Sequence, residues 1–220
     1  MSTESGIPDF RSEKGLYSAE QNYGHPPEYL LSRTCFKRRP DLFFRYYREN
    51  LVARSAQPNA AHLALAKLEG QGKLRAVITQ NIDGLHQAAG SKNVLELHGS
   101  NWRQYCMACK ARYGLDDVLA QEGIPSCEKC NGTVRPDVVL YEERLDDNVV
   151  NAAINAIAKA DLLIVGGTSL AVYPAAGLLQ YFRGESIVLV NKSATHLDEQ
   201  ARLVIRDSIG SVLGAVMKLL

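Results

Sequence analysis

The chain has 220 residues, of which 46% are hydrophobic and 22% charged, and its formal net charge is +1. This length and apolar content suit a globular protein with one sizeable domain, into which we expect a smaller module to be inserted. The near-neutral charge, without a long block of like charge, argues against a nucleic-acid-binding protein. No apolar run reaches 18 residues and the first 15 residues are polar, so we expect no membrane span, no signal peptide and a cytoplasmic location.

Residues 13–55 are rich in aromatic and basic side chains and contain several prolines, which predicts an irregular loop followed by short helices. From about residue 60 the pattern changes, because helix-like and strand-like segments alternate in the way typical of helices packed on a parallel sheet. Asn59 is placed to cap a helix whose apolar residues recur at helical spacing. Residues 76–78 then form an apolar run that predicts a buried strand.

The second half of the chain continues this alternation. An amphipathic helix is predicted after caps at Asp146 and Asp147, and a last helix closes the chain around residues 212–216. Between them, residues 162–165 and 187–190 are continuous apolar runs of the kind that strands show when both faces are covered. The sequence therefore predicts an α/β fold with a parallel sheet and helices on both faces.

The cysteines indicate a metal site. Four of the five form two Cys-x-x-Cys pairs separated by 17 residues: Cys106 and Cys109, then Cys127 and Cys130. This spacing is that of a four-thiolate zinc site, and a reducing compartment favours metal binding over disulfides, with redox use of either pair as the alternative. Four thiolates leave no open coordination position, so the zinc is expected to be structural. Cys35 stands alone, and we expect it to be a small buried apolar residue.

Small and polar residues follow the predicted strands, at the edge where parallel sheets bind ligands. Thr168 and Ser169 come after two glycines, where backbone amides and hydroxyls can bind phosphate, although a Gly-Gly turn is often only a turn. Asn191 and Lys192 end the next strand, and the amide of Asn191 could equally bind a ribose hydroxyl or cap the loop.

A further polar group lies at residues 79–83, where three side chains can bond amide and hydroxyl groups. His98 follows, at the place where a third strand should finish. A lone histidine is usually structural, but this one shares the predicted sheet edge with the polar group. Both a structural and a catalytic role therefore stay open on the residues alone.

Several motifs in order resemble the sirtuin family, of the bacterial type that acts on acetyl-lysine: residues 6–12, 79–83 and 97–99, the two cysteine pairs, and residues 135–139, 167–170 and 190–191. The resemblance spans nearly the whole chain. It implies a Rossmann-like domain and a zinc-ribbon module, with NAD and an acyl-lysine substrate meeting in the cleft between them. The implied division is an NAD-binding domain, a cofactor loop with the helical part of a small domain, and a zinc-binding module: residues 1–12, 56–103 and 134–220; 13–55; and 104–133.

The resemblance also implies roles for single residues. His98 would be the catalytic base, assisted by Asn81: after acyl oxygen displaces nicotinamide, it takes a proton from the ribose hydroxyls, and 2′-O-acyl-ADP-ribose is formed. An unperturbed imidazole pKa of about 6.5 suits that task. The implied NAD contacts are Thr3, Phe10, Arg11, Gln80, Asn81, Ile82, Asp83, Thr168, Ser169, Asn191, Lys192 and Ser208. The substrate peptide would add as a strand along Val138, Val139, Leu140 and Tyr141.

Two positions depart from the family pattern. The family has Phe-Gly-Glu where this chain has Tyr141-Glu142-Glu143. The family's fold also opens with an apolar strand and a Gly-Ala-Gly turn before the serine that is here Ser2, and this sequence contains neither. We therefore expect unpaired backbone groups in the neighbouring strands, each costing ~1–3 kcal/mol if buried, and weak NAD binding.

The function implied by the resemblance is NAD-dependent protein-lysine deacetylation, with NAD as co-substrate, structural zinc, and acyl-lysine proteins or peptides as partners. A sirtuin-like ADP-ribosyltransferase is one alternative, and His98 argues against it because a base is needed after nicotinamide leaves. The other alternative is a protein that binds NAD or acyl-lysine with little turnover.

Overall fold

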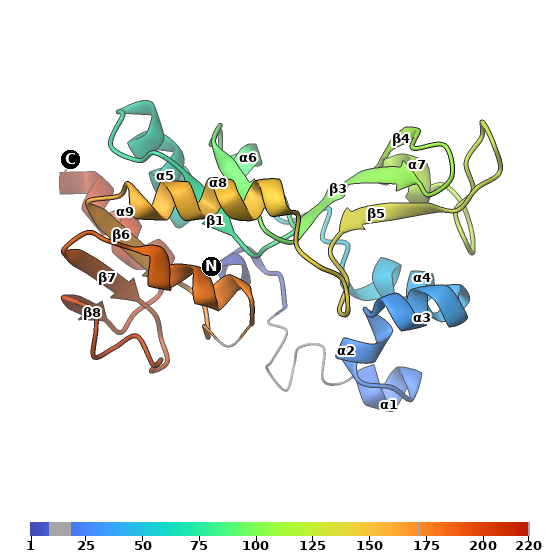
Figure 1. The fold of residues 1–220 in the computed structure, drawn as a ribbon, viewed down its shortest axis with the longest axis horizontal. Coiled ribbons are helices and arrows are strands. Elements are labelled where there is room, and N and C mark those ends of the chain that lie inside the picture. The colour runs from blue at the N-terminus through green and yellow to red at the C-terminus, as the bar shows by residue number, and fades with distance from the viewer. Residues whose placement is uncertain (9–18, 171, 220) are drawn as a thin grey trace.

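A computed structural model describes residues 1–8, 19–170 and 172–219 (Figure 1). Phe10 and Arg11, two of the predicted NAD contacts, lie outside the described residues. In chain order the elements are η1 (Ser2–Ser5), α1 (Ala19–Tyr23), α2 (Pro27–Leu30), α3 (Arg33–Arg38), α4 (Pro40–Asn50), α5 (Ala60–Gly70), β1 (Val77–Thr79), α6 (Leu85–Ala88), β2 (Val94–Glu96), β3 (Gly99–Cys106), β4 (Arg112–Gly114), α7 (Leu115–Leu119), β5 (Val134–Val138), α8 (Asp147–Ala158), β6 (Leu162–Gly166), η3 (Ala175–Tyr181), β7 (Ser186–Val190), β8 (Leu203–Ile205) and α9 (Ile209–Leu219). None of the helices described is long and apolar enough to cross a membrane.

The predicted helix starts are confirmed at both capping residues. The Asn59 side chain accepts a hydrogen bond from the amide of Ala61 and forms a capping box with His62, which satisfies amides that the first turn of α5 leaves unpaired. The Asp146 side chain accepts from the amides of Asn148 and Val149 at the start of α8. Both helices therefore begin where side-chain chemistry predicts.

The parallel strands form two sheets, whereas the apolar runs predict a single one. β1 pairs with β2, and β6, β7 and β8 form a second sheet in that order, with β7 in its middle. Among the described strands, none pairs with the second edge of β1 or of β6. These two edges agree with the expectation of unpaired backbone groups in the strands.

Helices cover both faces of this parallel layer (Figure 1). On one side, α5 and α9 share a core with β1 and β7, so they span both sheets. On the other side, α8 and η3 pack against Leu97 and the partly buried Ile78 and Leu95. The expectation that residues 162–165 are covered on both faces is wrong, because Leu162 is 50% and Ile164 36% exposed.

A long strand, β3, leads from the parallel layer to a separate antiparallel sheet of order β4-β3-β5 (Figure 1). The cysteines lie at the far end of this sheet, around a small core of their own. The predicted boundary between residues 103 and 104 falls inside β3, and the division into three units stays a prediction. Beside the sheet, α2, α3 and α4 pack around an aromatic core, in which Cys35 is fully buried as expected.

Candidate active site at the carboxyl ends of the strands

One cavity of about 960 Å³ lies where β1, β2, β6 and β7 end. All the predicted site residues within the described part of the chain, apart from the cysteines, line it: Thr3, Gln80, Asn81, Ile82, Asp83, His98, Val138, Val139, Leu140, Tyr141, Thr168, Ser169, Asn191, Lys192 and Ser208. The structure thus brings together residues from every strand end that the sequence analysis selects, as parallel topology requires. The individual roles of these residues stay predictions.

His98 lies just beyond β2 with its ring in a defined tautomer. Its Nδ1 is 2.9 Å from the carbonyl oxygen of Gln80. Because a carbonyl oxygen only accepts, Nδ1 carries the proton and the neutral ring leaves the lone pair of Nε2 available. Burial lowers the pKa of His98, and the bond to Gln80 offsets only part of that shift. The imidazole is therefore neutral at pH 7, which is the state a general base needs.

The loop after β1 is held by a chain of short hydrogen bonds. Asn81 Nδ2 donates to Ser2 Oγ at 2.7 Å, and Ser2 Oγ donates to Asp83 Oδ2 at 2.6 Å. The other carboxylate oxygen of Asp83 accepts from the amide of Leu85 at 2.9 Å, and its carbonyl oxygen accepts from Trp102 Nε1 at 2.6 Å. Asn81 and Asp83 therefore face the cavity in fixed orientations.

The opposite side of the cavity is built from turns. Gly167 has φ +61°, and a Cβ there would lie 2.5 Å from the amino nitrogen of Met1, so only glycine fits the turn that precedes Thr168. Asn191 Nδ2 donates to the carbonyl of Ser193 at 2.9 Å. The Asn191 amide therefore caps its own loop, which is one of the two roles expected for it. Asn191 also lines the cavity, so binding of a ribose hydroxyl stays a prediction.

The predicted substrate segment, residues 138–141, continues β5 along the cavity. Its amides are already bonded, since Val139 donates to the carbonyl of His98 at 2.9 Å and Tyr141 to the carbonyl of Leu31 at 3.0 Å. The amide of Leu140 donates to a carboxylate oxygen of Glu143 at 2.9 Å. A peptide adding along this segment cannot take these three amides without displacing an existing bond.

The residue after this segment occupies a conformation that favours glycine. Glu142 has φ +71°, in the left-handed region, at the position where the family pattern has glycine. Its carboxylate accepts from the amide of Thr34 at 3.0 Å and from the Thr34 hydroxyl at 2.7 Å. The substitution is thus accommodated by two bonds to α3 that a glycine could not make.

The four paired cysteines form one cluster. Their sulfur atoms all lie within 4.8 Å of one another, with 3.5 Å between Cys106 and Cys130 and 3.5 Å between Cys109 and Cys127. A tetrahedral zinc ion with bonds of about 2.3 Å would place its sulfur ligands about 3.8 Å apart, so the cluster fits this metal. The hydroxyl of Tyr113 donates to Cys127 Sγ at 3.0 Å and would orient that ligand.

Comparison with known proteins identifies the family. The model of the Sir2 family matches residues 1–174. NAD-dependent protein deacetylases of Clostridium acetobutylicum and Clostridium perfringens are each 59% identical over 218 residues, covering 99% of this chain and 89% of the relative. The chain belongs to the Sir2 family.

Solved sirtuin structures share its fold. A Sir2 structure with a deacetylated peptide and 3′-O-acetyl-ADP-ribose is 39% identical, with a TM-score of 0.90 over 99% of this chain and 89% of that one. A Sir2 structure bound to an acetylated peptide is 38% identical, with a TM-score of 0.85 over 99% and 88%. The predicted fold class, a Rossmann-like α/β fold with a small cysteine-bearing module, is confirmed.

Two residues of this sirtuin's cavity were missed by the sequence analysis. Ser2 links Asn81 to Asp83, but it is named there only as part of the opening pattern. His86 also lines the cavity, with its ring 4.8 Å from that of the buried His62. Burial, and then the neighbouring His62, lower the pKa of His86 to about 4, so the ring stays neutral. The sequence contains one signal for His86: it follows Asp83 closely, at the start of α6, so a residue near the cavity was to be expected there.

Proposed function

We propose that this sirtuin is an NAD-dependent protein-lysine deacetylase that releases nicotinamide and transfers the acyl group to ADP-ribose. The observation that carries the proposal is the position of His98: its Nε2 is unprotonated, and the residue lines the same cavity as the polar strand ends and the substrate segment. The deacetylases of both clostridia, at 59% identity, support the same reaction. Sirtuin structures that hold NAD, an acetylated peptide or acetyl-ADP-ribose support the two substrates.

In this proposal the chain binds and orients its two substrates and accepts a proton from one of them. NAD, when bound, supplies an electrophilic ribose carbon and nicotinamide as leaving group. Asn81 and Asp83, held by Ser2, offer amide and carboxylate groups to nicotinamide and ribose. The His98 Nε2 accepts a proton from a ribose hydroxyl, while the Gln80 carbonyl stabilises the imidazolium that results. Bound substrates would have to exclude water from the cavity, because the reactive sugar would otherwise be lost to it.

Zinc would have a different task, away from this cavity. The residues that would hold it are Cys106, Cys109, Cys127 and Cys130, and all four positions of the metal would be filled by sulfur. Bound zinc would supply folding energy to the end of the antiparallel sheet and no Lewis acid to the reaction. Cysteines stay available as thiolate ligands in a reducing compartment, and this supports a cytoplasmic location.

The test compares three readouts in the chain and in His98→Ala. With NAD and an acetylated peptide, the parent should release nicotinamide and deacetylated peptide in equal amounts. His98→Ala should deacetylate roughly 10²–10⁴-fold more slowly, the usual loss for a general base, while exchange of labelled nicotinamide into NAD persists. ADP-ribose attached to protein in place of acyl transfer would instead support the ADP-ribosyltransferase. Binding without nicotinamide release would support the binding protein.

A further inference from the structure

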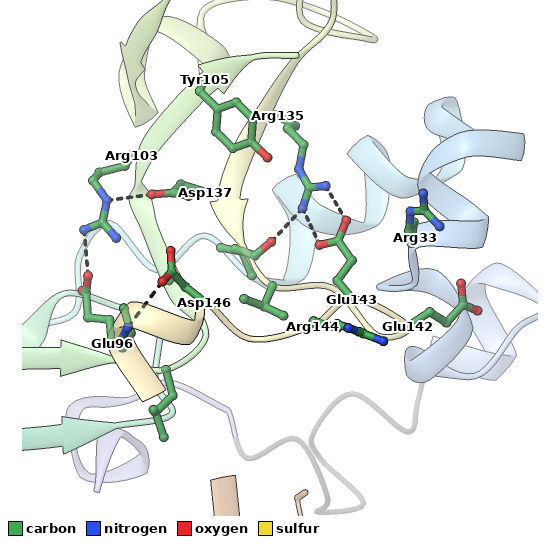
Figure 2. Close-up of a pocket in the computed structure, with 15 residues that line it drawn as sticks. Arg33, Glu96, Arg103, Tyr105, Arg135, Asp137, Glu142, Glu143, Arg144 and Asp146 are labelled. Atoms are coloured by element: carbon green, nitrogen blue, oxygen red, sulfur yellow. Dashed lines mark hydrogen bonds and ion pairs between the residues drawn. The ribbon is translucent and has the colours of Figure 1, made fainter. Parts of the chain in front are cut away.

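A buried arginine lies behind the substrate segment. Arg135 is on β5 and only 4% exposed. Its guanidinium meets both carboxylate oxygens of Glu143, with Nη1 to Oε1 at 2.7 Å and Nη2 to Oε2 at 3.0 Å (Figure 2). Nη2 also donates to the carbonyl of Val138 at 2.7 Å. The forked geometry is the strongest arrangement that arginine makes with a carboxylate.

Glu143 also bonds to the substrate segment, at Leu140. Its Oε2 accepts from the amide of Leu140 at 2.9 Å, and its own amide donates to the Leu140 carbonyl at 3.0 Å. Arg135 therefore bonds to Val138, the first residue of the substrate segment, and to Glu143, which follows the segment and bonds back to Leu140. Residues 139–142 form a loop whose two ends are fixed by one guanidinium.

The space behind this loop is polar. A cavity of about 650 Å³ lies there, and nine of its fifteen lining residues are charged (Figure 2). Because most of this lining is charged, apolar packing from this side contributes little to the position of the loop. The guanidinium itself is positioned by two aromatic rings, because it lies 5.1 Å from the centre of the Phe36 ring and 5.9 Å from that of Tyr105.

Glu143 is charged at neutral pH, so its ion pair with Arg135 persists there. Burial would raise the pKa of Glu143, but the hydrogen bonds from Arg135 and the Leu140 amide outweigh it, so the pKa lies below its ordinary value. Glu143 is therefore ionised at neutral pH. Arg135 lines the smaller cavity and not the large one, so within the described structure it acts through Val138 and Glu143.

We propose that Arg135 and Glu143 are positioning residues for the peptide: their ion pair holds residues 139–142 in the conformation that receives the acyl-lysine chain before it binds. This proposal rests on the proposed function. A loop held in advance loses no conformational freedom on binding, so weakening the pair should weaken peptide binding specifically. NAD meets other strand ends and should be little affected.

The test uses two conservative variants and a matched control. Arg135→Lys keeps the charge but loses the fork, and Glu143→Gln keeps the shape and the Leu140 contact but loses the charge. The control is Arg103→Lys, since Arg103 forms ion pairs with Glu96 and Asp137 in the same small cavity but does not contact the loop. We expect each test variant to raise the peptide KM roughly 10- to 100-fold, with the NAD KM and the control within about twofold of the parent.

Equal rises in both KM values, a fall in kcat alone, or unchanged kinetics would overturn the positioning role. Melting temperatures identify variants that are simply unfolded, and Glu143→Gln carries the test if Arg135→Lys does not fold. If neither folds, the pair is a folding requirement and the assignment is wrong. If the parent binds acetylated peptide without turnover, the proposed function fails separately, and peptide Kd measured by calorimetry on the same variants decides the positioning role. A parent that does not bind the peptide overturns both.

Discussion

His98 lines the cavity with its Nδ1 bound to the carbonyl of Gln80, and burial lowers its pKa. A base must be unprotonated to act, and a lowered pKa keeps the ring neutral further into acid. We therefore expect the acid limb of the pH profile of kcat/KM to lie below pH ~6.5, the value of an unperturbed histidine. Measuring kcat/KM for an acetylated peptide at saturating NAD, from about pH 5 upwards, tests this. A limb at or above that value would mean that another group limits the reaction.

Glu142 combines an unfavourable conformation with two bonds to Thr34. Thr34→Val removes the hydroxyl bond and leaves the conformation, so it should lower the free energy of unfolding by about 0.5–1.5 kcal/mol. Glu142→Gly loses both bonds but relieves a left-handed residue that costs about 1 kcal/mol, so its stability should stay within about 1 kcal/mol of the parent.

The two substitutions form a double-mutant cycle, measured by urea denaturation. Thr34→Val should have no effect in the Glu142→Gly background, because its partner is gone. If it destabilises that background as much as the parent, the bond to Glu142 is not the cause and Thr34 acts through α3 alone.

At the scale of elements, the cysteine cluster closes the end of the antiparallel sheet. Because a preformed zinc site does not exist in an unfolded chain, the metal's binding energy is folding energy, ~10–16 kcal/mol in isolated zinc-finger peptides. We expect one zinc per chain, and loss of both metal and activity in Cys127→Ser. Cys35→Ala, at the thiol outside the cluster, should keep the metal. Elemental analysis with melting curves checks both variants, and a stable, active Cys127→Ser chain without metal would contradict the assignment.

Elements with a strong local signal could be predicted from the sequence, and those without one could not. α5 and α8 were predicted because Asn59 and Asp146 cap them and apolar residues follow at helical spacing. β4 and β8 have only three residues each, which is too few for a recognisable alternation of apolar and polar residues. Whether such short segments form strands depends on neighbours that are distant in the chain. The left-handed Glu142 was not predicted either, since an acidic residue gives no signal for a turn that normally needs glycine.

At the scale of the whole molecule, the location of the site was predictable and its internal connections were not. Parallel strands bring their carboxyl ends to one edge, so the polar residues after each strand had to meet. The bond from Ser2 to Asp83 joins residues 81 apart in the sequence, and only the folded chain reveals it. The division of the parallel layer into two sheets likewise could not be read from apolar runs, because periodicity identifies strands but not their partners.

The two sheets have a consequence for how the molecule opens. β7 is paired on both sides, whereas β1 and β6 each have a partner on one side only among the described strands. In amide hydrogen exchange followed by mass spectrometry, β7 should therefore be the slowest of the three, and alternate amides of β1 and β6 should exchange through local fluctuations. A ligand that contacts both sheets across the cavity should slow exchange in β1 and β6 more than in β7, because β7 already opens only with the whole sheet. Equal slowing of all three strands by NAD would show that they open as one unit. Greater slowing in β1 and β6, the expected result, would mean that the bound cofactor is the bridge that makes the two sheets behave as one.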